Sequence, residues 1–165
     1  MKEVCIGQIV NTHGLKGELR IVSSFPYKKL IFKNGFKIYV GNRRDCCVIK
    51  SYRQHKIYDM VTFEGVDSID SAIAYKGDYV YIHREDLKID GYIAEDIINF
   101  DVYHNENKIG KISSIVNNGA HDILVIETLN EKKVMIPLVD EYVKKVDLEK
   151  QIVIIEPIEG MLNED

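Results

Sequence analysis

The sequence contains no long hydrophobic run and little cysteine. None of its apolar stretches approaches the roughly 18 residues that a membrane-spanning helix needs, so we expect no integral membrane protein. The first residues show no charged region followed by an apolar one, which argues against secretion. The three cysteines are odd in number, and Cys46 and Cys47 are adjacent, which argues against a disulfide framework. We therefore expect a cytoplasmic protein.

The sequence also lacks the short motifs that mark common active sites. It has no G-x-S-x-G turn, no H-E-x-x-H motif and no C-x-x-C pair, so we expect no catalytic residue, no metal and no cofactor. Cys46 and Cys47 are expected to point to opposite faces of a strand, one into the core and one outside, so they cannot share a metal ion. Cys5, next to an isoleucine in a strand, is expected in the core.

An enzyme is kept as a rival class. His121 and Asp122 could act as a base with its orienting acid, but adjacent residues rarely give the required hydrogen-bond geometry, so a turn is favoured. A small hydrolase or a nuclease would use this pair or His13.

The charge of the chain is divided between its two ends. Residues 1–56 contain twelve Lys and Arg and three acidic residues, a net charge of +9. Residues 57–165 contain ten basic and 23 acidic residues, a net charge of −13. A basic segment suits a phosphate backbone, and an acidic segment suits a basic protein. Solvated surface charge without a partner is the alternative interpretation.

Apolar and polar residues alternate with a period of two through the first half of the chain, which predicts strands. One helix is expected to begin after an N-cap at Asp67 or Ser68 and to end at Gly77. Six strands and one helix predict a small closed antiparallel barrel. The strands are expected at residues 4–10, 17–23, 36–40, 46–52, 57–63 and 79–82.

The second half predicts another β-barrel or roll. Segment 83–91 is charged and lacks periodicity, so we place a linker at 85–94, between domains at 1–84 and 95–165. No repeat of 20 to 50 residues is present, so a solenoid is not expected. The fold class is therefore all-β, with two small barrels. Strands of the second barrel are expected at residues 97–103, 108–116, 123–126, 134–137, 143–146 and 152–155.

The segment from Thr12 to Glu18 is the first candidate for function. Two glycines flank Lys16, and glycine permits backbone angles and close approaches that other residues do not. We expect a hairpin pinned by glycine in either case. As an addition to this structural role, the loop would present Lys16 to phosphate, although its spacing does not match a P-loop. Arg43 and Arg44 form an exposed basic pair on a second turn, and the planar guanidinium suits phosphate.

The segment from Asn117 to Asp122 is the second candidate. Asn and Gly tolerate positive φ, and Asp122 can cap its own backbone, so a turn is predicted. Gly119 has either a folding role or a binding role there. Pro137 stands at the end of a predicted strand, where a missing N–H is tolerated.

These segments together resemble the RimM family of ribosome maturation factors, also called 16S rRNA processing proteins. The HGLKGE-type loop and the GAHD-type turn are specific in combination, and the ordered set covers nearly the whole chain. The matching segments are residues 6–20, 61–67, 119–125, 135–137 and 143–148.

The resemblance implies a six-stranded translation-factor-like barrel followed by a PRC-barrel. It also implies a non-catalytic assembly factor that binds the small ribosomal subunit and a protein of its head, small-subunit protein nineteen, and aids maturation of the 3′ domain of 16S rRNA. We expect a monomer that makes no membrane contact. The alternative is a stand-alone RNA-binding module that contacts rRNA directly. Tyr92 matches one residue of the family's paired-tyrosine motif, but Ile93 follows it, so the motif is only partly present.

Two sets of residues are predicted to form the binding sites. The set for the rRNA or particle side comprises the glycine-flanked loop and its basic neighbours: His13, Gly14, Lys16, Gly17, Arg20, Arg43 and Arg44. The set for the ribosomal protein comprises the junction, the second turn and the strand end: Tyr92, Gly119, Ala120, His121, Asp122 and Pro137.

Overall fold

The chain folds into two compact units, Met1–Ile89 and Asp90–Asp165, which are described separately. The computed structural model describes residues 2–118, 120–157 and 160–162. The division falls within the predicted linker 85–94, and the domain boundaries at 84 and 95 stay predictions. Among the described residues, we find no helix with the length and apolar character needed to span a bilayer.

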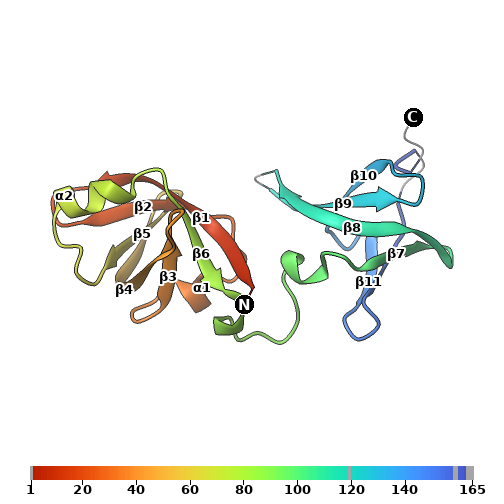
Figure 1. Ribbon diagram of the computed structural model, residues 1–165, viewed down its shortest axis with the longest axis horizontal. Helices are drawn as coiled ribbons and strands as arrows, with labels where there is room; N and C mark the ends of the chain where they lie inside the picture. Colours follow the sequence, from red (N-terminus) through yellow and green to blue (C-terminus); the bar gives the residue numbers. More distant parts are fainter. Residues whose placement is uncertain (1, 119, 158–159, 163–165) are drawn as a thin grey trace. The chain divides into compact units, whose positions relative to one another are not determined.

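The first unit is a closed barrel of six strands in the order β1-β2-β5-β4-β3-β6 (Figure 1). All neighbouring strands pair antiparallel, which confirms the predicted closed antiparallel barrel. The strands are β1 (Glu3–His13), β2 (Glu18–Val22), β3 (Lys37–Val40), β4 (Asp45–His55), β5 (Tyr58–Phe63) and β6 (Tyr79–His83).

Alternation along the strands builds the core of this barrel. On β1, Val4, Ile6 and Ile9 are buried, and a β-bulge between Cys5 and Gly7 shifts the pattern by one residue. Cys5 lies between two inward residues and is therefore exposed, so its predicted place in the core is wrong. Cys47 is buried and Cys46 exposed, which confirms the prediction for that pair.

Short helices lie between the strands of the barrel and after β6. The predicted helix is α2 (Ile69–Ala72), which continues as the 3-10 helix η1 (Ile73–Tyr75), and its N-cap is Ser68. The helix α1 (Lys28–Ile31) and the 3-10 helix η2 (Arg84–Asp86) were not predicted.

A buried carboxylate fixes α1 to the barrel. Asp59 on β5 is 1% exposed and forms an ion pair of 2.8 Å with Lys28 Nζ. Its Oδ1 accepts a hydrogen bond of 2.7 Å from the Tyr52 hydroxyl. A buried charge is tolerated only when it is paired and hydrogen-bonded, so these contacts tie α1 to β4 and β5.

The second unit contains a six-stranded sheet in the order β10-β9-β8-β7-β12-β11. Its neighbours pair antiparallel except β7 and β12, which are parallel. The two six-stranded sheets confirm the all-β fold class. The strands are β7 (Asp101–His104), β8 (Asn107–Asn117), β9 (Asp122–Thr128), β10 (Lys133–Pro137), β11 (Val143–Asp147) and β12 (Ile152–Ile155).

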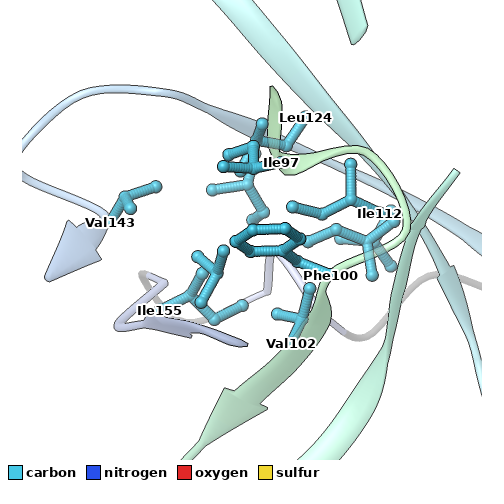
Figure 2. Packing of buried hydrophobic residues seen from close by; sticks show 11 residues of the cluster. Ile97, Phe100, Val102, Ile112, Leu124, Val143 and Ile155 are labelled. Atoms are coloured by element: carbon cyan, nitrogen blue, oxygen red, sulfur yellow. The ribbon is translucent and has the colours of Figure 1, made fainter. Parts of the chain in front are cut away.

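The core of the second unit is aliphatic with one aromatic ring. Figure 2 shows Phe100 among side chains from β7, β8, β9, β11 and β12, and all of these residues belong to one buried cluster. Ile97 comes from the 3-10 helix η3 (Ala94–Ile97), so the strand predicted at residues 97–103 is wrong over its first half.

Candidate functional site

Polar side chains from four neighbouring strands, most of them charged or imidazole groups, gather on the outside of the first barrel. Arg20 pairs with Met60 and Met60 with Arg53, so the two arginines lie on the same face of the sheet. The same face carries the ends of β1 and β4. We call this group the basic face: His13, Glu18, Arg20, Arg53, His55 and Tyr58.

Arg20 lies at the centre of the basic face. Its Nη2 donates a hydrogen bond of 2.7 Å to His13 Nδ1, and its guanidinium carbon lies 5.4 Å from the centroid of the Tyr58 ring. The ring centroids of His13 and His55 are 5.8 Å apart. Because arginine can only donate, His13 Nδ1 must accept, which places the proton of the neutral imidazole on Nε2. The structure therefore brings two predicted residues, His13 and Arg20, into direct contact.

Glu18 is the carboxylate of the basic face. Its oxygens accept two hydrogen bonds from Arg53, of 2.9 and 2.8 Å. The hydrogen bond from Arg53 lowers the pKa of Glu18 against the opposing effect of burial, and the positive charge of Arg53 lowers it further. Partial desolvation lowers the pKa of His55, and the charges of Arg53 and Lys56 act in the same direction.

The glycine-flanked loop next to His13 keeps Lys16 in solvent. Gly14 and Gly17 have φ of +71° and +89°, in the left-handed region that favours glycine. A Cβ at Gly17 would overlap the carbonyl oxygen of Val66, whereas nothing lies within 4 Å of one at Gly14. Gly17 therefore permits the close approach to residue 66, and Lys16 is exposed beside it.

Arg43 and Arg44 lie apart from the basic face, at the start of β4 rather than its end. Arg44 Nε forms a 3.0 Å bond to Glu3, and its guanidinium lies 3.6 Å from the ring centroid of Tyr81. The prediction of an exposed pair is correct for Arg43, whose side chain is 87% exposed, and wrong for Arg44, which is held by these two contacts.

The second predicted turn is held by asparagine. Asn118 Oδ1 accepts hydrogen bonds from the backbone N–H groups of Ala120 (2.9 Å) and His121 (2.8 Å). The Asp122 carboxylate accepts a 3.0 Å bond from Asn117 Nδ2. The turn prediction is thus confirmed for the described residues, while Gly119 lies outside them.

An outward-facing row of apolar side chains crosses β8, β9 and β10. Ile123 pairs with Val116 and with Pro137, and Val125 pairs with Met135, so all five share the face opposite the core. Val116 is 45% and Met135 59% exposed. We call these five residues the apolar strip. The backbone N–H of the residue after Pro137 bonds to the Asp122 carbonyl at 2.8 Å, which brings the turn and the strand end together.

Tyr92 lies elsewhere in the second unit. It is half-buried and packs against the core cluster that contains Ile97 and Phe100. Packing accounts for this side chain in the structure, and its predicted contact with a protein stays a prediction.

Metal-binding geometry is not found in the described part of the chain. None of its His, Cys, Asp and Glu side chains gather in groups of three or more that could hold a metal ion.

Family models match both units. The model described as the RimM N-terminal domain matches residues 4–87, and the RimM PRC barrel domain matches residues 94–161. The chain belongs to the RimM family. Both the resemblance and the PRC-barrel fold of the second unit are thereby confirmed.

Two relatives with the name ribosome maturation factor RimM match over almost their whole length. The relative from Staphylococcus haemolyticus is 38% identical over 168 residues, which covers 98% of this chain and 99% of the relative. The relative from Ligilactobacillus salivarius is 36% identical over 162 residues, covering 94% and 96%. The solution structure of the N-terminal domain of RimM from Thermus thermophilus is 26% identical, with a TM-score of 0.48, and covers 54% of this chain and 98% of that chain.

Several residues of this RimM chain's candidate sites were not predicted. Arg53 and His55 lie between the strands predicted at residues 46–52 and 57–63 and were not predicted as site residues, and the apolar strip was not predicted as a surface. The strip could have been predicted from the segment Val134-Met135-Ile136-Pro137. Alternate residues of a strand face opposite sides, and in this segment the residues of both sides are apolar. A strand that is apolar on both faces predicts a second covered surface.

Proposed function

We propose that this RimM chain is a non-catalytic assembly factor of the small ribosomal subunit that acts in the cytoplasm. One observation carries the proposal: the first unit has a net charge of +5 and the second of −9. The charge division predicted at residue 56 is thus smaller when counted by structural unit, but it keeps its sign. Two units of opposite charge suit two different partners, an RNA and a basic protein.

The basic face and Lys16 are proposed to contact rRNA of the particle. Arg20 and Arg53 supply planar donors that match phosphate oxygens, and Lys16 adds a mobile charge in solvent. Binding through such contacts releases counterions, so affinity falls as salt concentration rises. Arg43, which lies apart from the basic face, provides a second positively charged position on the same barrel.

The apolar strip is proposed to bind a basic ribosomal protein, small-subunit protein nineteen of the head. Met135 and Val116 supply apolar area that a partner can bury. The acidic charge of the second unit attracts a basic partner and orients its approach. The turn at Ala120–Asp122 lies at one end of the strip and would contact the edge of that protein.

Two single substitutions separate the two interfaces. We expect Lys16→Glu to weaken binding of the full chain to a 16S rRNA 3′-domain fragment by about tenfold. The number of counterions released on binding, measured from the slope of log affinity against log salt concentration, should fall by about one. Met135→Glu should weaken binding to the purified ribosomal protein by about tenfold, because it buries a charge. Each substitution should leave the other interaction unchanged.

Matched controls lie outside both surfaces. Lys37→Glu on β3 and Leu129→Glu on the β9–β10 turn make the same chemical changes at exposed positions. If the full chain binds the RNA and ignores the ribosomal protein, the proposal gives way to a stand-alone RNA-binding module. Cleavage of the RNA with multiple turnover that is lost in His13→Ala or His121→Ala would overturn the non-catalytic role.

A further inference from the structure

The basic face holds more positive than negative charge. The groups that face His55 come from every neighbouring element: His13 of β1, Glu18 and Arg20 of β2, Arg53 of β4, Lys56 of the following turn and Tyr58 of β5. Within this group Glu18 is the one carboxylate, and both of its oxygens bind Arg53. Arg20 therefore has no acidic partner among the described residues.

Arg20 is also short of hydrogen-bond acceptors. Its Nη2 bonds to His13, while its Nε is buried and has no acceptor among the described residues. A partly desolvated guanidinium without a counter-charge is unfavourable, and an anion is the ligand that would relieve it. Phosphate oxygens match the planar donor geometry of the guanidinium and can bind it in a bidentate way.

We propose that the basic face is a binding site for an RNA phosphodiester, and that its occupation adds a proton to the His55 imidazole. The phosphate would lie between Arg20 and His55, near the ring of His13. This inference rests on the proposed rRNA contact and names the chemical group that the basic face receives.

The direction of the proton transfer follows from the charges around His55. In the free protein, partial desolvation and the neighbouring cations lower the pKa of His55, which favours its neutral imidazole. A bound phosphodiester adds negative charge beside the ring and raises the pKa of the same group. Binding therefore takes up a proton, and RNA affinity should rise as pH falls below about 6.5. The Nδ1 atom of His13 already accepts the bond from Arg20, so we assign the added proton to His55.

Nuclear magnetic resonance titration of the histidine rings in the full chain tests this directly. The pKa of His55 is measured free, with a short single-stranded RNA, and with inorganic phosphate. We expect the pKa to rise in the RNA complex, while that of His104 on β7 of the second unit stays unchanged. No rise with RNA would overturn the inference. A rise with inorganic phosphate together with none in the RNA complex would assign the site to a free anion and overturn it as well.

Affinity measurements give an independent readout. Between pH 7.5 and 5.5, RNA affinity of the parent chain should rise by about tenfold, within the limit of one tenfold step per pH unit that a single proton sets. His55→Gln should flatten this dependence, and the control His104→Gln should retain it. Equal pH dependence in His55→Gln and the parent chain would contradict the inference.

The result separates this inference from the proposed function. RNA binding with an affinity that does not change with pH would remove the proton-coupled site and leave the rRNA contact in place. Failure of the full chain to bind RNA at any pH would remove both.

Discussion

Two glycines in one loop show how differently neighbouring residues of the same type are constrained. Gly14 and Gly17 both have positive φ, and only Gly17 lies against another backbone segment. A side chain at Gly14 adds backbone strain alone, whereas one at Gly17 also meets the Val66 carbonyl oxygen. The loop that presents Lys16 is therefore anchored at its second glycine.

Alanine substitution should separate these two roles. We expect Gly14→Ala to lower the free energy of unfolding by about 1 kcal/mol, because alanine must adopt the left-handed conformation. Gly17→Ala should lower it by about 3 kcal/mol or more, since the backbone must also move away from Val66. Urea unfolding of both variants measures the difference. Equal losses would show that the contact with Val66 is unimportant.

Tyr52 makes the barrel sensitive to high pH. Desolvation and the bond to the Asp59 carboxylate raise the pKa of Tyr52 to about 12, above its ordinary value of 10.0. Above pH 10 the unfolded chain loses the phenol proton and the folded chain keeps it. The stabilisation is therefore complete below about pH 10 and is lost as pH rises toward 12. Tyr75, whose pKa is also raised to about 12, adds a parallel loss.

Stability measured against pH tests this assignment. Tyr52→Phe should lose about 1 kcal/mol at pH 7, where it removes one hydrogen bond. Its free energy of unfolding should then fall less steeply than that of the parent chain between pH 10 and 12. Tyr79→Phe, at a 53% exposed position, is the control and should follow the parent curve. A Tyr52→Phe curve parallel to the parent would contradict the assignment.

The residues of the basic face show what a sequence can and cannot predict at this scale. The period of two is enough to put Leu19 in the core and Arg20 outside. The neighbours of Arg20 depend on strand register, because Arg53 reaches the same face only through the pairing of both arginines with Met60. Register is a long-range property of the closed barrel, so Arg53 and His55 were not predicted as site residues.

At the scale of the elements, the start of α2 can be tested at its N-cap. The Ser68 hydroxyl accepts a bond of 3.2 Å from the Ser71 N–H, and the Ser71 hydroxyl accepts one of 3.3 Å from the Ser68 N–H. Ser68→Ala should therefore lower the free energy of unfolding by about 1 kcal/mol. Ser68→Asp retains an acceptor and should restore most of it. Thermal unfolding checks both variants, and equal losses would argue against a capping role.

The helices α1 and α2 differ in what a sequence reveals about them. The boundaries of α2 are marked locally, by a serine N-cap and the later Gly77, and it was predicted. The four residues of α1 have no side-chain cap and are held by the contact of Lys28 with Asp59, which lies far along the sequence. The segment 97–100 was predicted as strand because short apolar runs do not distinguish strands from buried helical turns.

At the scale of the whole molecule, the two units should separate by charge. Fragment 1–89 has 15 basic and ten acidic residues, and fragment 90–165 has seven basic and 16 acidic residues. Since each unit has its own buried core, we expect each fragment to unfold cooperatively. At pH 7 the first should bind a cation exchanger and the second an anion exchanger. Circular dichroism melts and ion-exchange elution measure this, and a fragment without a cooperative melt would contradict it.

The fold class of both units was predictable, but the order of strands was not. Alternation predicts which segments are strands. It does not predict that β3 pairs with β6, or that β12 lies between β7 and β11. These pairings join segments distant in sequence and are set by closure and packing of the whole sheet.

The place of β12 has a consequence for how the protein is made. The last strand in chain order lies inside its sheet and joins β11 to the earlier β7. During translation, the first barrel has all its strands once His83 has been added, whereas the second sheet stays in two pieces until Ile155. The nascent chain thus passes through a stage in which the first barrel has all its strands, while β11 is not yet connected to β7 through β12. A stop codon before Ile152 would make this separation of β11 from the rest of the sheet permanent.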